Sequence, residues 1–224
     1  MPKLRTDSWT LQPKLNPDMR TTDFHYELPP ELIASRPLVD RESSRMMLVN
    51  RATSEISHHR FSDFPDLLPP DHLLVLNDTK VIPARLFSND GKVELVRTDA
   101  PDPNHWWCLV RPGKKMRDGR SVEVGKSIGT VIQTNHKGER LIKWDTPPDL
   151  EVHGHLALPH YMEREPDKSD RDRYQTVYAK EEGAIAAPTA GLHFTPELLS
   201  KLDHTFPTLH VGVGTFRPVK TDDP

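Results

Sequence analysis

Six short apolar runs between residues 81 and 144 constrain the fold of this chain more than any other feature of its sequence. Turn-forming stretches rich in Gly, Pro, Asn and Asp separate them, and each run is too short for a typical helix. The runs cover residues 81–87, 92–97, 106–110, 121–124, 130–134 and 140–144. Many short strands at even spacing are typical of a small antiparallel barrel or sandwich. We therefore predict a small antiparallel β-barrel over residues 81–149.

The sequence on either side of this region indicates a mixed α/β domain. We expect two strands over residues 45–50 and 55–59, and a third strand, buried on both faces, over residues 72–77, in which an unbroken apolar run lies between His72 and Asn77. Thr195 and Pro196 have the residue types of an N-cap and a first helical position, so a helix is expected to begin there. The predicted fold class is α/β, in which a discontinuous α/β domain of residues 23–80 and 150–224 holds the barrel as an insertion.

The composition excludes several classes of protein. Residues 1–22 are polar and contain no apolar run, which indicates a flexible extension and not a secretory signal. No apolar stretch approaches the length of a membrane span. The lone Cys108 rules out a disulfide within the chain, and this suits a cytoplasmic protein. With a net charge of -3 there is no general attraction for nucleic acid, so any RNA contact depends on local basic patches.

A bend of small residues is the most distinctive local pattern. Residues 183–195 carry almost no charge, although 28% of the chain is charged. Small residues let main chain approach a ligand closely, and His193 lies two residues before the predicted helix cap. The same pattern also fits a tight, buried connection between a strand and a helix, which the spacing alone somewhat favours.

Other polar residues have two interpretations each. Asp78 follows the predicted strand at 72–77, where α/β folds place ligand contacts, but it also suits a turn that bonds local main chain. Residues 170–178 mix charged, aromatic and amide groups that fit either a nucleotide or RNA contact or a salt-bridged surface segment. Arg85 and Arg217 stand beside apolar residues and are candidates for carboxylate or phosphate pairing, while solvated surface arginines are the commoner case.

Two familiar kinds of site are not expected. The twelve histidines show no spacing typical of metal ligands, so no metal is predicted. Gly212 and Gly214 follow a strand-like segment, but Arg217 stands in the place of the third glycine of a dinucleotide-binding motif and Pro218 blocks the helix that should follow. The two glycines still indicate close approach of main chain to another group.

Taken together, the motifs resemble the S-adenosylmethionine:tRNA ribosyltransferase-isomerase family of queuosine biosynthesis. The resemblance covers roughly residue 22 to the end of the chain. It is carried by residues 26–29, 76–79, 82–86, 91–94, 111–112, 174–179, 186–195, 208–212 and 214–219. Three of these motifs, at 174–179, 186–195 and 208–219, are long and specific.

The resemblance implies an α/β domain with an inserted barrel and a tRNA-modifying reaction. The ribosyl part of S-adenosylmethionine would move to 7-aminomethyl-7-deazaguanine (preQ1) at the wobble position of tRNA, giving epoxyqueuosine and releasing adenine and methionine. S-adenosylmethionine is then a consumed substrate, and no cofactor is needed. A monomer without membrane contact is expected.

The resemblance also directs the choice of site residues. His193 is the first candidate for acid–base work, because an imidazole titrates near neutrality, and His210 is the second. Asp78 is the candidate for the deazaguanine edge or its amine. The candidates for binding are Tyr174, Gln175, Thr189, Gly191, Gly212 and Gly214, with Arg85 and Arg217 as partners of phosphate or carboxylate.

The chain also departs from the family pattern. The connection over residues 202–207 is shorter than usual, which predicts a missing or shortened strand. The family continues well beyond residue 224, so the resemblance is to its amino-terminal portion, and the alternative function is a non-catalytic RNA- or nucleotide-binding module or an inactive remnant. For tRNA docking, the barrel offers a basic stretch that would equally suit a solvated loop. Its residues are Lys114, Lys115, Arg117 and Arg120.

Overall fold

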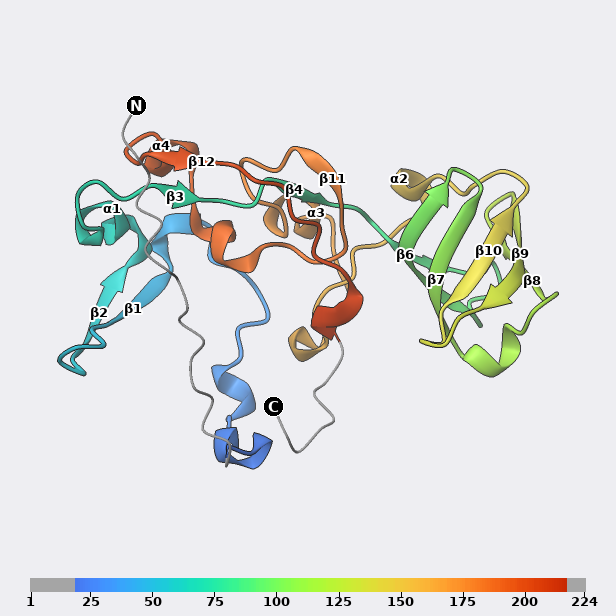
Figure 1. Ribbon diagram of the computed structural model, residues 1–224, viewed down its shortest axis with the longest axis horizontal. Coiled ribbons are helices and arrows are strands. Elements are labelled where there is room, and N and C mark those ends of the chain that lie inside the picture. Colours follow the sequence, from blue (N-terminus) through green and yellow to red (C-terminus); the bar gives the residue numbers. More distant parts are fainter. Residues whose placement is uncertain (1–18, 217–224) are drawn as a thin grey trace, which may run out of the picture. The chain divides into compact units, whose positions relative to one another are not determined.

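The computed structural model describes residues 19–216, which fall into two compact units (Figure 1). Residues 19–33 belong to the first unit and contain two 3-10 helices, Thr21–Phe24 and Pro30–Leu32. Residues 34–216 form the second unit, which holds every strand of the described chain. Most of the predicted flexible extension lies outside the described residues.

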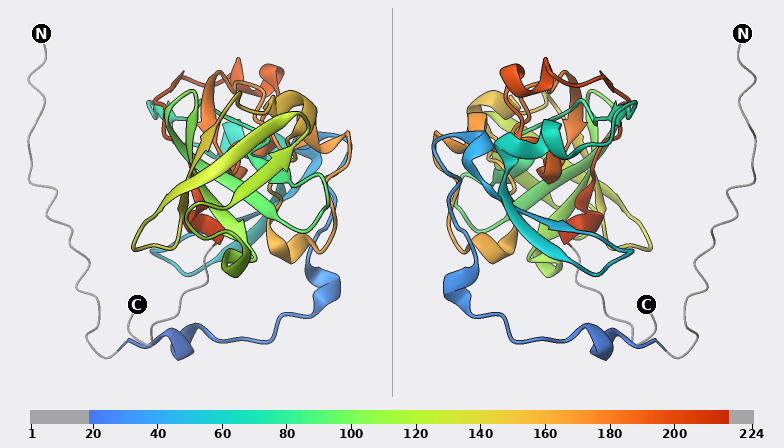
Figure 2. Two further views of the ribbon diagram at one scale, coloured as in Figure 1. Left: turned by 90° about the vertical axis from the view of Figure 1, so that its right-hand side faces the viewer. Right: turned by 90° about the vertical axis from the view of Figure 1, so that its left-hand side faces the viewer.

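The predicted barrel is a six-stranded antiparallel sheet in the order β5-β6-β7-β10-β9-β8. Its green and yellow strands face the viewer in the left panel of Figure 2. Its two outer strands are linked through Asn89, whose main-chain N–H donates to the Glu123 carbonyl oxygen at 2.9 Å. The sheet is therefore nearly closed, as the prediction of a barrel required. The strands are β5 Arg85–Phe87, β6 Glu94–Asp102, β7 His105–Arg111, β8 Ser121–Val124, β9 Ser127–Thr134 and β10 Arg140–Trp144.

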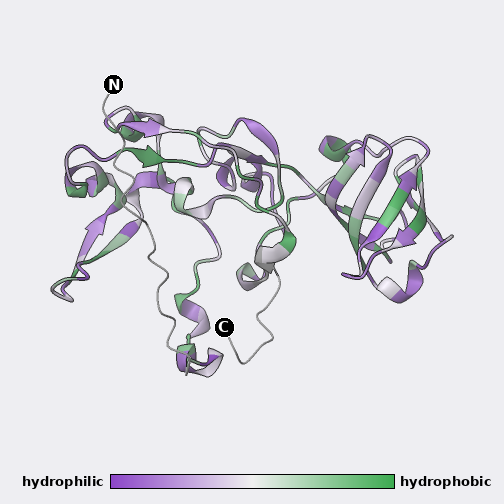
Figure 3. Cartoon of the chain, viewed as in Figure 1, coloured by the Kyte–Doolittle hydropathy of each residue, from purple (hydrophilic) through white to green (hydrophobic). Residues whose placement is uncertain are grey.

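Alternating burial along these strands fills the barrel interior. In β8, Val122 and Val124 are buried while their neighbours are exposed, as the period of two requires; Figure 3 shows hydrophobic and hydrophilic residues mixed along the sheet. Gly129 lies against the two largest core residues of β10. A Cβ at this glycine would come within 2.6 Å of Ile142 Cγ2 and 2.8 Å of the Trp144 ring, so only glycine fits.

Two short parallel pairs lie outside the barrel. Strand β4, Thr79–Val81, pairs with β11, Glu181–Ala184, and β3, Leu74–Val75, pairs with β12, His204–Thr205. The strand predicted at 72–77 is thus only two residues long. The prediction that it is buried on both faces is wrong, because Leu73 is 60% exposed and Val75 is 65% exposed. The shortened strand expected within 202–207 is present as β12.

The remaining elements form a second core beside β3. The hairpin of β1, Arg45–Val49, and β2, Ile56–Arg60, confirms the two predicted strands, and helix α1, Phe64–Leu67, follows it. Helix α4, Pro196–Leu199, begins as predicted: the Thr195 hydroxyl accepts a hydrogen bond from Leu198 N–H at 3.1 Å. The buried residues of this core are Phe61, Leu76, Phe194, Leu198 and Leu199.

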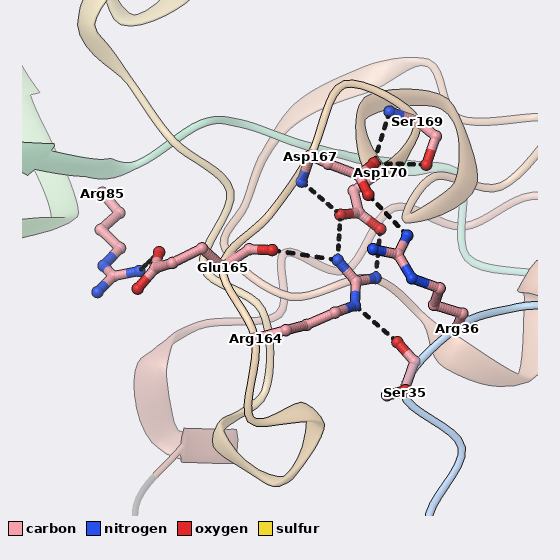
Figure 4. Close-up of polar contacts among 8 residues, drawn as sticks. All are labelled: Ser35, Arg36, Arg85, Arg164, Glu165, Asp167, Ser169 and Asp170. Atoms are coloured by element: carbon pink, nitrogen blue, oxygen red, sulfur yellow. Dashed lines mark hydrogen bonds and ion pairs between the residues drawn. The ribbon is translucent and has the colours of Figure 1, made fainter.

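One ion pair organises the segment that returns from the barrel (Figure 4). This segment contains the one-turn helices α2, Leu150–His153, and α3, Asp170–Arg173. The Arg164 guanidinium bonds both carboxylate oxygens of buried Asp170, at 2.6 and 2.7 Å, and donates to the Ser35 carbonyl oxygen at 2.7 Å. The 170–178 segment is therefore salt-bridged, as one of its two interpretations proposed, although Asp170 itself is buried.

No helix within residues 19–216 is both long and apolar enough to cross a membrane. The same residues contain no group of three or more His, Cys, Asp or Glu side chains that could hold a metal ion.

Replacing Gly129 with alanine should destabilise the barrel by about 1–3 kcal/mol, because the added methyl group forces Ile142 and Trp144 apart. Urea unfolding followed by tryptophan fluorescence measures this, since Trp106 and Trp144 lie in the barrel core. Ile128→Ala, on the same strand but 47% exposed, is the matched control and should change stability much less. Equal effects of the two substitutions would contradict this packing.

Replacing Asp170 with asparagine should lower the free energy of unfolding by about 3 kcal/mol at pH 7, because Arg164 is left without its partner. The Arg164 hydrogen bonds hold the pKa of Asp170 below its usual 3.8, so the pair stabilises the fold above that pH and loses its contribution as the pH falls through the folded-state pKa. Denaturation followed from pH 7 into the acid range should therefore show a constant gap between the two proteins down to about pH 3.8 and a narrowing gap below it. Asp66→Asn, at an exposed carboxylate, is the control, and a gap independent of pH would refute the assignment.

Candidate functional site

Three segments far apart in the sequence meet at one place, which we call the junction: residues 77–79, 183–186 and 207–211. Asp78 is buried, and its Oδ1 accepts a hydrogen bond from the Thr208 hydroxyl at 2.6 Å. Its main-chain N–H donates to the Pro207 carbonyl oxygen at 3.2 Å, and its carbonyl oxygen accepts from Lys180 N–H at 2.8 Å. Asp78 therefore joins the first segment to the third, and its carbonyl oxygen bonds the chain just before the second.

The Asn77 side chain aligns two of these segments. Its Oδ1 accepts from Leu209 N–H at 2.9 Å, and its Nδ2 donates to the Leu209 carbonyl oxygen at 2.7 Å. The amide thus pairs with both main-chain groups of Leu209, as a neighbouring strand would. This contact places Thr208 and His210 beside the end of β4.

His210 occupies the exposed side of the junction. Its Nδ1 lies 2.7 Å from the hydroxyl of buried Thr79, and the two groups are hydrogen-bonded. Its ring lies over Gly183, where a Cβ would come within 2.8 Å of the imidazole. The ring is therefore held on one side by a hydroxyl and on the other by bare main chain, while the residue remains exposed to solvent.

The bend of small residues is partly buried and partly exposed. Residues 184–187 are buried, and Ala184 and Ala187 pack with Val81, Leu156 and Tyr174, as a tight connection requires. The chain then turns into a 3-10 helix, Thr189–His193, whose first residue is exposed. The buried part fits the interpretation as a tight connection, and contact with a ligand stays a prediction for the exposed residues 189 and 190.

Gly191 packs beneath this exposed turn against two side chains. A Cβ at Gly191 would overlap the Tyr178 hydroxyl and approach Thr176 Cγ2 at 3.0 Å. The Thr176 hydroxyl is buried and has no hydrogen-bond partner among residues 19–216. A buried hydroxyl without a hydrogen bond lowers the stability of the folded state. This one lies beside the exposed turn at Thr189, a candidate for ligand binding.

Tyr174 and Gln175 fix the main chain beneath the junction. The Gln175 amide accepts from Val81 N–H at 2.9 Å and donates to the Val81 carbonyl oxygen at 3.1 Å. Tyr174 is buried, and burial raises the pKa of its phenol. Both residues were predicted as binding candidates, and both contact protein groups in this structure.

His193 lies among other residues. Its Nδ1 is 3.1 Å from the Ser44 hydroxyl, and its ring is 5.1 Å from the ring of Phe61. Burial lowers the pKa of its imidazole below the ordinary 6.5, so the neutral form predominates at pH 7. The two candidate histidines therefore differ in setting: His193 is half-buried against an aromatic core, and His210 is exposed at the junction.

The remaining candidates, two arginines and two glycines, are not part of the junction. Arg85 in β5 bonds Glu94 at 2.7 Å and Glu165 at 3.0 Å, so two carboxylates already face its guanidinium. Gly212 and Gly214 are exposed, and a Cβ at either would meet no atom within 4 Å. Arg217 lies outside the described residues.

Sequence reasoning missed the roles of Asn77, Thr79, Thr208 and Gly183. Each lies in or next to one of the family motifs. The sequence does not show, however, which distant residue a hydroxyl or amide in a loop will bond. The alternation of Thr208 and His210 is the one available hint, because residues two apart in an extended chain point to the same face.

The sequence model of one family, described as "Queuosine biosynthesis protein", matches residues 21–224. The chain belongs to this family. The match includes all three segments of the junction and the whole barrel.

Two relatives show the extent of the similarity. Both are named S-adenosylmethionine:tRNA ribosyltransferase-isomerase: the protein from Clostridioides difficile (strain 630) is 44% identical over 220 residues, and that from Thermotoga maritima is 43% identical over 216 residues. Each alignment covers 92% of this chain and 64% of the relative, so the chain spans less than two thirds of their length. A crystal structure of the Thermotoga maritima S-adenosylmethionine tRNA ribosyltransferase is 33% identical, covering 84% of this chain and 58% of that one, with a TM-score of 0.35.

Thr79→Val should release the His210 ring, because valine keeps the shape of threonine but cannot bond Nδ1. Nitrogen NMR shifts of the imidazole should then report a mixture of tautomers in place of one fixed form. Thr205→Val, at an exposed threonine of β12, is the control. Unchanged His210 chemical shifts in Thr79→Val would show that this hydrogen bond does not fix the tautomer of the imidazole.

Proposed function

We propose that this chain provides the amino-terminal part of an S-adenosylmethionine:tRNA ribosyltransferase-isomerase. The reaction would transfer the ribosyl group of S-adenosylmethionine to 7-aminomethyl-7-deazaguanine at the tRNA wobble position, form epoxyqueuosine, and release adenine and methionine. The observation that carries the proposal is the junction, where motifs 130 residues apart meet through the Thr208 contact to the buried Asp78 carboxylate.

The charge of the segment that precedes β11, together with Asp78, suits this substrate pair. S-adenosylmethionine is a sulfonium cation, and the acceptor carries an amine. Residues 145–182 contain ten Asp or Glu and five Lys or Arg, a net charge of -5. Asp78 adds a carboxylate whose second oxygen receives no hydrogen bond from residues 19–216. A buried carboxylate attracts a cation or a hydrogen-bond donor, so we assign Asp78 to the amine or the deazaguanine edge.

The chemical step needs a base and a leaving-group contact. A sulfonium acidifies the neighbouring ribose C5′ hydrogens, so a neutral imidazole within reach can remove one. His193 is held in that neutral form at pH 7 by burial, and His210 offers an exposed ring of fixed orientation. We propose His193 as the first candidate for this proton transfer and His210 as the second.

The other candidate residues take supporting roles in this proposal. Thr189 supplies the exposed turn, and Gly191, packed beneath it, supplies its close main chain. Gly212 and Gly214 supply exposed main chain after the junction. Tyr174 and Gln175 position the strand below. Arg85 and Arg217 are proposed partners of a phosphate or carboxylate, which at Arg85 requires competition with Glu94 and Glu165.

We further propose that the α/β domain is discontinuous, formed by residues 23–80 and 150–224 around the barrel at 81–149. The parallel pairing of β4 with β11 supports this, because it joins chain that precedes the barrel to chain that follows it. We also propose a cytoplasmic monomer that acts on preQ1-containing tRNA with no cofactor beyond the consumed S-adenosylmethionine.

Incubation of the purified chain with S-adenosylmethionine and tRNA carrying the deazaguanine precursor should release adenine. His193→Ala should lower the single-turnover rate by about 10²–10⁴ if His193 is the general base. Because its pKa lies below 6.5, the wild-type rate should be constant near pH 7–8 and fall only below 6.5. His210→Ala is the paired variant, and folding of both is checked by circular dichroism.

Three results would change this assignment. A normal rate in folded His193→Ala removes that residue from the mechanism, and a selective loss in His210→Ala transfers the role to His210. Retention of tRNA by the wild-type chain without adenine release would instead favour the non-catalytic binding module.

A further inference from the structure

Charge is distributed unevenly along the chain, and the barrel is its basic part. Residues 85–144 contain twelve Lys or Arg and seven Asp or Glu, a net charge of +5, whereas the whole chain carries -3. The segment that follows the barrel, residues 145–182, carries -5. A polyanion is therefore attracted to the barrel and repelled by the segment after it.

The basic charge is most dense in one loop, residues 111–120, which we call the basic loop. It joins β7 to β8 and contains five basic residues and one acidic residue. All five basic residues are exposed. The acidic residue, Asp118, accepts a hydrogen bond from the Thr134 hydroxyl at 2.7 Å, so it already has a partner within the protein. The five are Arg111, Lys114, Lys115, Arg117 and Arg120.

The basic loop has a fixed shape. The Arg140 guanidinium donates to the carbonyl oxygens of Met116, at 2.8 Å, and Gly113, at 3.2 Å, and also to that of Gly138. The Met116 side chain is buried in the barrel core, only 2% exposed. The Arg120 carbonyl oxygen accepts from Val131 N–H at 2.9 Å. The cationic side chains therefore project from main chain that is ordered before any partner arrives, which reduces the entropy lost on binding.

We propose that the basic loop is a docking surface for the phosphate backbone of tRNA. This inference rests on the proposed function and adds to it the surface that holds the RNA. Lysine and arginine charges on an ordered loop bind phosphates without reading sequence. A membrane surface fits less well, because interfacial segments insert apolar side chains and the one large apolar residue of this loop, Met116, is buried.

The test compares two variants of equal charge change. The first reverses the loop with Lys114→Glu, Lys115→Glu and Arg117→Glu; the second reverses three exposed residues outside the barrel, Arg51→Glu, Lys168→Glu and Lys201→Glu. Affinity for an unmodified tRNA transcript is measured by fluorescence anisotropy between 50 and 200 mM salt. The loop variant should bind about tenfold or more weakly, with a salt dependence flatter by about 2–3 in log–log slope. The control should remain near wild type.

The outcomes separate this proposal from the proposed function. Unchanged affinity in the loop variant, or equal loss in both variants, overturns the docking surface while adenine release by wild type would still support the enzyme. Binding that depends on the loop without any adenine release supports the surface and contradicts the enzyme. If the loop variant does not fold, Lys114→Gln, Lys115→Gln and Arg117→Gln provide the same comparison, with a smaller expected loss.

Discussion

The parallel pairing of β4 with β11 is the contact on which the rest of this structure depends. It joins residues 79–81 to residues 181–184 across an intervening segment of about one hundred residues, which includes the barrel. Such a short pair buries little area and is marginal by itself. Side-chain amides extend it: Gln175 pairs with the main chain of Val81, and Asn77 pairs with that of Leu209. Two amides thus supply hydrogen bonds that additional strand residues would otherwise make, and they bring Asp78, Thr79 and His210 together.

How far the sequence predicts this fold depends on how local each signal is. Strands β8 and β10 were predicted with their observed bounds, because alternation and flanking turns are properties of a few neighbouring residues. The run at 72–77 misled the same reasoning, since burial on both faces requires neighbouring strands that the sequence of the run does not encode. In the structure β3 has one strand partner in the described chain, and Val75 remains exposed.

The candidate site shows the same limit. Asp78 and His210 were selected from residue type and motif, and the structure places both at the junction. Their proximity could not be derived from spacing, because it depends on the Asn77 contact over 132 residues of chain. His193 was preferred for its motif, yet the ring bonds Ser44 and packs on Phe61, contacts that arise from a different core. A motif therefore identifies which residues are special more readily than it identifies what they touch.

The separation of charge along the chain suits the two substrates of the proposed reaction, which have opposite charges. In the proposed reaction S-adenosylmethionine is a cation, and the acceptor amine is cationic until it loses a proton, while the tRNA that carries the acceptor is a polyanion. One surface of a single sign would attract one substrate and repel the other. On the proposals made above, a basic barrel next in sequence to an acidic segment would resolve this conflict, because the loop that Arg140 orders would hold RNA backbone while the cationic substrate would meet the Asp78 carboxylate. The overall charge of -3 conceals this division, and only the distribution of charge along the chain reveals it.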